Sequence, residues 1–418
     1  MPSLSFPKSL KKQSVPDPSP WEHDAVLLDR DDVSDFNEEN ILPVSQEERV
    51  KIREWLQPTA YNDEGGEFRK HLSSHLDNTG TWLLDEPAYR QWHSTTDDGI
   101  LWIKGIPGSG KSVVAATLVD HLMKEQVPVI YFFFRQIIDA NHVPQAALRD
   151  WLDQLLEYSP PLQTKLLEYL KQSRSLKSLS NADFWALIRT AMLYLPRAYW
   201  VVDALDEIDH GQDMVDFFDG LTKLGMWRPA QVKIVMTSRP VPSVEVPLRH
   251  AQTLVLHLEE KMVDRDIATF VQHMIKMSSI EEEYHDAIRQ AVPGRANGLF
   301  LYARLAMDAF LEPGADPKQV LEDLPTDLNI MYDDLLREHL RRTSISSDLQ
   351  LLIMQSVTHA SRPLRLLELS DMINVTQFHD SVRDIKKSKG LVRTACGPLL
   401  EILPDGKQFS GHKDLFKT

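Results

Sequence analysis

Residues Gly99 to Asp120 read GILWIKGIPGSGKSVVAATLVD, and the order of residue types in this stretch decides the fold. It opens with a short apolar run, Ile100–Ile103, of the kind that forms a buried strand. Residues Gly105–Ser112 match the phosphate-loop pattern G-x-x-x-x-G-K-[ST] in full. Apolar residues then recur at helical spacing from Val113 to Val119. Strand, glycine-rich loop and helix therefore follow one another as a phosphate-binding loop requires.

The residue types of this loop suit a phosphate. Glycine adopts positive φ and has no Cβ, so backbone N–H groups can close around phosphate oxygens at a helix N-terminus. Lys111 adds a cation for the β- and γ-phosphates, and Ser112 offers a hydroxyl to Mg²⁺. An ordinary glycine turn before a helix is the alternative, and the full match with its flanking elements favours nucleotide binding. The predicted nucleotide-binding residues are Gly105, Gly108, Ser109, Gly110, Lys111 and Ser112.

Composition limits the kind of protein in which this loop works. The chain has 418 residues and 42% hydrophobic content, enough for two or three domains with real cores. A formal net charge of −15 argues against a broad nucleic-acid surface. The single cysteine, Cys396, excludes an internal disulfide and is expected to be a buried thiol. Without a run of 18 apolar residues or a signal peptide, we expect a soluble, cytoplasmic protein.

The N-terminal quarter of the chain divides into two parts. Residues 1–43 hold five prolines among the first 20 residues, and six acidic residues from Asp29 to Glu39, which predicts a disordered arm. Residues 44–98 form a helical lead-in that begins at a capping box, Ser45 with Glu48. His71 and His75 have metal-ligand spacing on one of its predicted helices, 67–76. Since no third ligand is evident, we interpret them as part of a helix face.

A second motif, YWVVDALDEID at residues 199–209, places acids at the end of a strand. Asp203 is the last residue of the apolar run, and the carboxyl ends of parallel strands form the edge where ligands bind. Its carboxylate is predicted to hold Mg²⁺ opposite Ser112. Asp206 and Glu207 follow, and one of them could orient or deprotonate the water that attacks the γ-phosphate. Glu207 is the preferred candidate.

Three further apolar runs, 127–134, 232–240 and 253–258, complete a predicted set of five strands. The second of them, VKIVMTSRP, ends in Arg239, whose guanidinium matches phosphate geometry. We favour Arg239 as a sensor of the γ-phosphate over the alternative that it caps the sheet or pairs with Asp206 or Glu207. The helices predicted between the strands, at 144–158, 161–170 and 182–195, indicate an α/β fold.

The chain becomes helical after residue 260. Residues 261–345 are predicted to form a helical domain, punctuated by Leu324-Pro325. Residues 346–418 begin with helices and lead to strands expected at Gly390–Thr394 and Leu399–Leu403, a pattern that suggests a winged-helix-like domain. The P-loop core is then assigned to residues 99–260.

Together the motifs GIPGSGKS, VVDALDEID and KIVMTSRP, the lead-in WLQPTAYNDEGGEFRKHL and the later SRPLRLLEL closely resemble the fungal NACHT-type, nephrocystin-like members of the STAND class of P-loop ATPases. The resemblance covers about residues 44–403. It implies a five-stranded parallel sheet of order 5-1-4-3-2 and an ADP/ATP switch with Mg²⁺ that controls oligomerisation. The roles that it implies are phosphate and Mg²⁺ binding for Lys111 and Ser112, Walker B acid for Asp203, hydrolysis for Glu207 and sensing for Arg239. Pro325 corresponds to a proline of the helical domain that lies near the base of the nucleotide in relatives.

Two features depart from those relatives. Ala204 stands where many of them have glycine after the Walker B aspartate. No histidine-containing segment of the expected context and no internal repeat follow the predicted hairpin, and His412 does not match that context.

The sequence thus predicts a slow, Mg²⁺-dependent ATPase switch that self-associates, acts through an unknown protein effector, and has neither a membrane span nor a nucleic-acid partner. A nucleotide-binding scaffold without turnover and a small-molecule P-loop phosphotransferase are the alternatives.

Overall fold

The structure is a computed structural model that describes residues 43–135, 141–193, 195–249, 251–343, 345–360, 364–377, 388–392, 400–402 and 408–411. Three expectations lie outside the described residues: the arm before residue 43, Cys396 and His412. Among the helices that are described, none combines the length and the apolar character needed to cross a bilayer.

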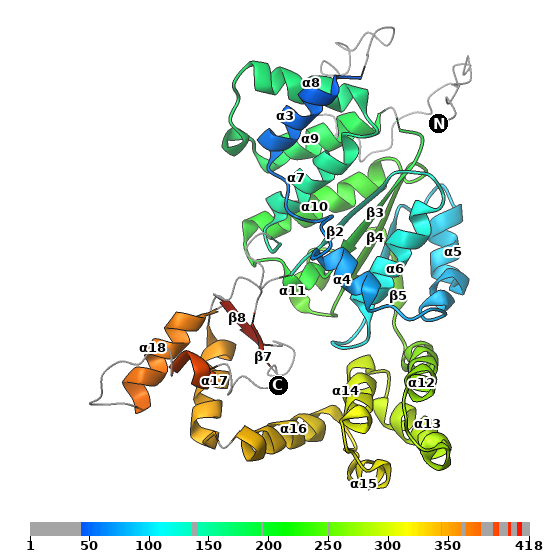
Figure 1. The fold of residues 1–418 in the computed structure, drawn as a ribbon. Coiled ribbons are helices and arrows are strands. Elements are labelled where there is room, and N and C mark those ends of the chain that lie inside the picture. Colours follow the sequence, from blue (N-terminus) through cyan, green and yellow to red (C-terminus); the bar gives the residue numbers. More distant parts are fainter. Residues whose placement is uncertain are drawn as a thin grey trace.

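A five-stranded parallel sheet lies at the centre (Figure 1). Its strands run in the spatial order β2-β3-β4-β1-β5, which confirms the predicted order 5-1-4-3-2 and the place of the Arg239 strand between the other two motif strands. All four pairings are parallel, so the carboxyl ends of the strands share one edge. The strands are β1 (Ile100–Lys104), β2 (Val129–Phe133), β3 (Ala198–Asp203), β4 (Val232–Ser238) and β5 (Leu254–His257).

Alternate residues of the strands contribute to two hydrophobic cores, one on each face of the sheet, because successive side chains of a strand point to opposite faces. Trp102, Phe132 and Trp200 pack on one face, and Ile103 and Phe133 on the other. The helices that contribute to the core on the first face are α3 (Gln46–Leu56), α7 (Pro144–Leu155), α8 (Pro160–Lys171), α9 (Asn181–Met192) and α10 (Gln212–Trp227). Those on the second are α4 (Glu67–Ser73), α5 (Pro87–Ser94) and α6 (Lys111–Met123).

Short elements connect these layers, and the lead-in begins as the sequence predicts. Ser45 and Glu48 form the capping box: the Glu48 carboxylate accepts from the Ser45 backbone N–H at 2.9 Å, and the Glu48 N–H donates to the Ser45 hydroxyl at 3.3 Å. The predicted helix at 67–76 ends at Ser73. The connecting elements are the 3₁₀ turns Thr81–Asp85, Leu176–Ser178 and Leu205–Glu207 and the short helix α11 (Pro242–Glu245).

A separate hydrophobic cluster holds the helices after the sheet, and it includes the buried side chains of Ile267, Tyr302 and Met307. Helix α13 runs through Pro293 and ends at Ala296. The helices of this group are α12 (Glu260–Met277), α13 (Glu282–Ala296), α14 (Phe300–Leu311), α15 (Pro317–Asp323) and α16 (Leu328–Thr343).

The last described elements are two helices and a small antiparallel sheet of order β6-β8-β7. The strand expected at Leu399–Leu403 is confirmed as β7, but the one expected at Gly390–Thr394 is wrong, because residues 388–392 are helical. Packing explains this: Val392 is fully buried with Ile353 and Leu369. The elements are α17 (Ser347–His359), α18 (Leu366–Gln377), β6 (Leu364–Arg365), β7 (Leu400–Ile402) and β8 (Gln408–Gly411).

Candidate nucleotide-binding site

The loop from Gly105 to Gly110 joins β1 to the N-terminus of α6, so its backbone lies at the carboxyl edge of the sheet. Gly108 and Gly110 have φ values of +75° and +88°, a conformation that strains residues with a Cβ. At Gly105 the reason is space, because a Cβ there would lie 2.9 Å from the hydroxyl oxygen of Ser109. Backbone conformation thus favours glycine at 108 and 110, and limited space favours it at 105.

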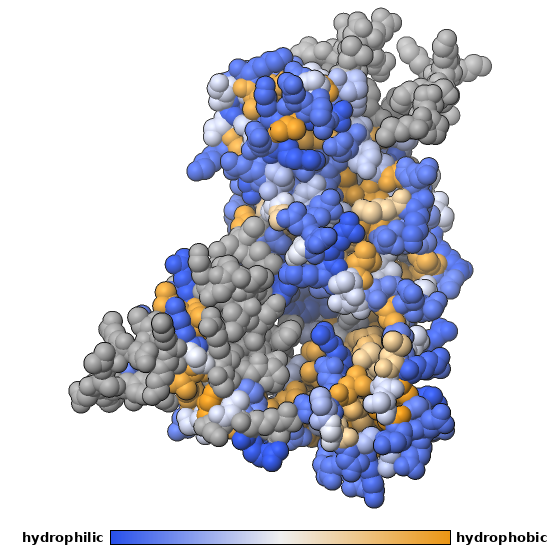
Figure 2. Space-filling view, in the orientation of Figure 1, coloured by the Kyte–Doolittle hydropathy of each residue, from blue (hydrophilic) through white to orange (hydrophobic). Residues whose placement is uncertain are grey.

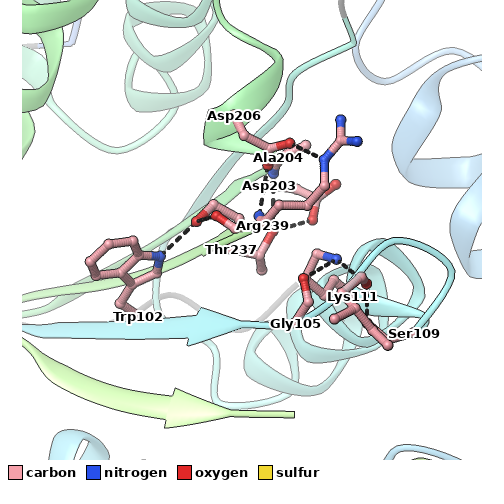
Figure 3. A network of polar contacts seen from close by, with 11 residues as sticks. Trp102, Gly105, Ser109, Lys111, Asp203, Ala204, Asp206, Thr237 and Arg239 are labelled. Atoms are coloured by element: carbon pink, nitrogen blue, oxygen red, sulfur yellow. Dashed lines mark hydrogen bonds and ion pairs between the residues drawn. The ribbon is translucent and has the colours of Figure 1, made fainter. Parts of the chain in front are cut away.

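Lys111 folds back over the loop (Figure 3). Its ammonium donates to the carbonyl oxygens of Gly105 at 2.9 Å and Ile106 at 2.8 Å. Ser109 is nearly buried, and its hydroxyl donates to the same Ile106 carbonyl at 2.8 Å. Ser109 therefore braces the loop, and the ammonium of Lys111 is held against the loop backbone at the N-terminus of α6.

Asp203 ends β3 and is fully enclosed, with 1% of its surface exposed. The Thr237 hydroxyl donates to one of its carboxylate oxygens at 2.6 Å and accepts the backbone N–H of Ala204 at 3.0 Å. Burial raises the pKa of Asp203, while the charge of His71 and hydrogen bonds from Thr237 and Ser112 oppose that rise. The hydroxyl of Ser112 therefore lies beside the carboxylate of Asp203.

Ala204 takes the left-handed conformation, with φ 58° and ψ 50°. That conformation turns the chain sharply after Asp203 and starts the 3₁₀ turn Leu205–Glu207, in which the Glu207 N–H donates to the Ala204 carbonyl at 2.9 Å. The resemblance already marked this position as one where relatives have glycine, and the structure gives the physical reason for glycine there.

Asp206 and Arg239 form an ion pair at the same edge. The Arg239 Nε donates to one carboxylate oxygen of Asp206, and the Arg239 backbone N–H donates to the other at 2.9 Å. The pair is well shielded, with 5% of the Asp206 side chain and 18% of the Arg239 side chain exposed. The pairing that the sequence left open as an alternative is thus present, and it fixes Arg239 close to Asp203 and Thr237 (Figure 3).

Four side chains near the site were not predicted to be there. Glu67 of α4 is buried, and its carboxylate lies 2.7 Å from Nη1 of Arg135 and 2.8 Å from Nζ of Lys70. His71, one turn after Glu67, packs on Phe133, the β2 residue that pairs in register with Asp203. The rule that strand ends carry sites could have found Arg135, two residues beyond β2, but the sequence held no signal that α4 would cover this edge.

Within the described part of the chain, no group of three or more His, Cys, Asp or Glu side chains suited to a metal ion is found. His75 Nε2 instead lies 3.0 Å from the Thr79 carbonyl oxygen.

The first turn of α14 contacts the phosphate loop. The backbone N–H of Leu301 donates to the Gly108 carbonyl at 3.3 Å, and a Cβ on Gly108 would lie 3.1 Å from the Leu301 Cβ. Pro325 is tied to the same helix, because the hydroxyl of the buried Tyr302 donates to its carbonyl. The structure thus connects Pro325 to the loop through α14.

A parallel sheet of order 2-3-4-1-5, a phosphate loop after β1 and a buried aspartate at the end of β3 define a P-loop NTPase fold with an additional strand between the two motif strands. Such a fold binds a nucleotide at the edge where the loop and the aspartate meet.

Residues 78–239 match the family described as "Nephrocystin 3, N-terminal". The chain is also 27% identical over 343 residues to the vegetative incompatibility protein HET-E-1 of Podospora anserina, an alignment that covers 78% of this chain and 25% of that protein. The chain thus spans about a quarter of its curated relative. These two similarities confirm the resemblance to fungal NACHT-type, nephrocystin-like domains.

Among solved structures, the chain resembles the Walker-type ATPase of Pyrococcus abyssi, with 11% identity, a TM-score of 0.38 and coverage of 84% of this chain and 94% of that one. It also resembles the AMPPCP-bound DnaA of Aquifex aeolicus, with 13% identity, a TM-score of 0.36 and coverage of 78% and 89%. At such low TM-scores the fold assignment rests on the sheet order and the loop themselves.

Proposed function

We propose that this protein is a STAND-type molecular switch that binds ATP or ADP with Mg²⁺ and hydrolyses ATP slowly to control its conformation and self-association. The observation that carries the proposal is a phosphate loop whose Lys111 ammonium bonds the Gly105 and Ile106 carbonyls, at the same sheet edge as the buried Asp203 carboxylate that Thr237 holds at 2.6 Å. The loop and its lysine follow β1, the acid ends β3, and both strands pair with β4, so one ligand at this edge can contact all three.

The residues present fit a magnesium ion. Hydroxyl and carboxylate oxygens are the ligands that Mg²⁺ accepts, and Ser112 and Asp203 supply one of each. When bound, the ion would neutralise charge on the phosphoryl oxygens. Thr237 would hold the Asp203 carboxylate in place through its 2.6 Å hydrogen bond, and the loop N–H groups and Lys111 would bind the phosphates.

Glu207 is the residue that we propose to orient or deprotonate the attacking water. Asp206 was the other candidate, but both of its oxygens hold Arg239, so we propose that it acts by positioning that guanidinium. Arg239 would then report the γ-phosphate, since the planar guanidinium matches phosphate geometry.

The contact between Leu301 and Gly108 suggests how nucleotide state reaches the helices. A phosphate that draws the loop backbone around itself changes the position of the Gly108 carbonyl, and α14 with Pro325 would follow. The small sheet with α17 and α18 would be the winged-helix-like part that rearranges when subunits assemble. The boundaries 44–98, 99–260, 261–345 and 346–418 remain the proposed division, and we propose a cytoplasmic location and a protein effector.

Phosphate release by the full chain and by Glu207→Gln, measured in Mg²⁺ with ATP, tests the enzymatic part. We expect slow release by the wild type, loss of release in the variant, and ATP affinity equal in both. Binding without release by the wild type would contradict the hydrolysis claim and favour a scaffold. Phosphorylation of an added small-molecule acceptor would contradict the switch and favour a phosphotransferase.

Light scattering of the full chain with ADP and with a non-hydrolysable ATP analogue tests the assembly claim. We expect a larger mass with the ATP analogue. Equal masses in both nucleotides would contradict nucleotide-controlled self-association while leaving nucleotide binding unaffected.

A further inference from the structure

A pocket of about 580 Å³ lies on the helical side of the sheet, within the volume range of ligand pockets. It lies between the C-terminal end of α3, the first turns of α7 and α9 and the segment after α8. The nucleotide-site residues described above do not line it. In Figure 2 the surface over α3, α8 and α9 is mainly hydrophilic, with hydrophobic residues in small groups.

The lining of this pocket is positively charged in a strongly acidic protein. Arg149, Arg174 and Lys177 line it, and no aspartate or glutamate does, although the chain has 61 acidic and 46 basic residues. Arg174 is paired with Asp183 at 3.1 Å. Arg149 and Lys177 have no ion pair with a carboxylate among the described residues, and the Arg149 Nε is buried without a hydrogen-bond partner there. The pocket therefore holds cationic groups that a ligand can neutralise.

The rest of the lining is apolar and aromatic. Trp55 is fixed by its indole N–H, which donates to the Arg174 carbonyl at 2.9 Å. Phe184 forms part of the lining with only 1% of its surface exposed, and Leu176, in the segment after α8, also lines the pocket. Cations beside fixed aromatic walls suit a ligand that carries carboxylates next to an aromatic or apolar side chain.

We propose that the occupant is an acidic peptide segment, residues 29–39 of this chain, with Phe36 in the pocket and its acidic neighbours on Arg149 and Lys177. This segment reads DRDDVSDFNEE and holds six carboxylates around one phenylalanine. Its carboxylates are complementary to the cationic groups of the pocket, and its phenylalanine is complementary to the apolar and aromatic lining. The proposal concerns a second site and does not depend on the proposed nucleotide switch.

The length of chain between the segment and the pocket is sufficient. The backbone N–H of Val44 is anchored to Gln163 of α8 at 3.1 Å, at the start of α3. Eleven residues of α3 span about 16 Å to its C-terminal end, where Trp55 lies. Seven residues from Phe36 to Pro43 reach about 23 Å when extended. Phe36 can therefore reach the pocket in the same chain.

Cleavage after Phe36 by a low concentration of chymotrypsin tests the proposal in the full chain. Docking buries Phe36, so cleavage follows the fraction of undocked segment when docking is fast. We expect Arg149→Glu/Lys177→Glu to be cleaved about tenfold faster than the wild type, which corresponds to about 1.4 kcal/mol of lost docking free energy. The control Lys165→Glu/Lys223→Glu makes the same change in net charge on α8 and α10 and is expected to be cleaved at the wild-type rate.

A charge swap separates docking from damage to the fold. Adding Asp31→Lys/Asp32→Lys to the pocket variant is expected to restore protection, with each rate normalised to cleavage of a synthetic peptide of the same sequence. Restoration would support the pairing, since a merely misfolded pocket is not repaired by charges in the segment. Equal cleavage of the wild type and the pocket variant, or no restoration by the swap, would overturn the proposal.

Carbodiimide cross-linking of a mixture of ¹⁴N- and ¹⁵N-labelled chains identifies the occupant. We expect cross-links from Lys177 to carboxylates of residues 29–39 within one chain. Cross-links only between differently labelled chains would overturn the proposal in favour of a second copy. Absence of any such cross-link would also overturn it.

Discussion

Two lysines at opposite ends of the central sheet make nearly the same bonds and have different consequences. Lys111, at the carboxyl edge, donates to the carbonyls of Gly105 and Ile106. Lys233, at the amino end of β4, donates to the carbonyls of Thr95 at 2.6 Å and Asp98 at 2.8 Å. Lys233 is fully buried, and burial lowers its pKa to about 8.

The difference lies in what surrounds each ammonium. At the amino end, the carbonyls belong to the turn that precedes β1, and Lys233 holds that turn against the sheet. At the carboxyl edge, the carbonyls belong to a loop in which Gly108 and Gly110 have positive φ, and Lys111 is only half-buried. The same kind of hydrogen bonding therefore stabilises the fold at the amino end of the sheet, whereas at the carboxyl edge it belongs to the loop that we propose binds phosphate.

The largest expected effect is at Lys111. Lys111→Ala removes a charged donor from the phosphates, and charge-assisted hydrogen bonds contribute about 1.5–3 kcal/mol, so ADP affinity in Mg²⁺ should fall by about a hundredfold. Calorimetric titration measures the affinity, and thermal unfolding without nucleotide should be nearly unchanged. Unchanged ADP affinity would contradict the role given to the loop.

Lys233→Ala should reverse that pattern. The change leaves a cavity at a fully buried position and two carbonyls without their donor, so the free energy of unfolding should fall by about 2 kcal/mol. Urea unfolding of the nucleotide-free chain provides this value. ADP affinity of the folded variant should match the wild type, and a large loss of affinity would show that the two ends of the sheet are not separate in function.

Two buried aspartates extend the comparison. Asp150 of α7 resembles Asp203 in being buried and bonded to a threonine, because Thr59 donates its N–H at 2.7 Å and its hydroxyl at 2.5 Å. Burial raises the pKa of Asp150 to about 7. Asp203 lies beside Ser112 and Lys111 at the ligand edge, whereas Asp150 holds the segment after α3.

The raised pKa of Asp150 predicts how stability changes with pH. The folded state binds the proton more tightly than the unfolded chain does, so the free energy of unfolding should fall as pH rises from about 4 to about 7. Asp150→Asn should remove about 1.4 kcal/mol of the fall between pH 6 and pH 8. Urea unfolding at these two pH values measures it, and an equal fall in the variant would refute the assignment.

The smallest expected effect concerns Ala204, whose left-handed backbone is strained. Ala204→Gly should raise the free energy of unfolding by about 0.5 kcal/mol, because relief of strain exceeds the entropy that glycine adds to the unfolded chain. Ala88→Gly, in helix α5, is the control and should lower it by about 1 kcal/mol. Destabilisation by both variants would argue against strain at Ala204.

Local patterns predicted the parts of the site that lie within one motif. The glycine loop, Asp203 at its strand end and Arg239 at the neighbouring strand end follow from periodicity and from the rule for parallel sheets. The strand order came from the resemblance, because spacing along the chain does not tell which strands are neighbours.

Other features depend on partners that are distant in sequence. The pairing of Arg239 with Asp206, and the ion pair of Glu67 with Arg135, are decided by which of several nearby charges comes within reach once the sheet forms. The strand expected at Gly390 failed for a related reason: a short apolar pair fits helix or strand, and burial of Val392 against two helices decided it.

Hydrogen exchange of the full chain with and without ADP and Mg²⁺ tests the central claim most directly. The account predicts slower exchange at residues 105–112 and, through the Leu301 contact with Gly108, at residues 299–302, with both effects absent in Lys111→Ala. Unchanged exchange at 105–112, or protection that persists in Lys111→Ala, would contradict nucleotide binding at this edge of the sheet.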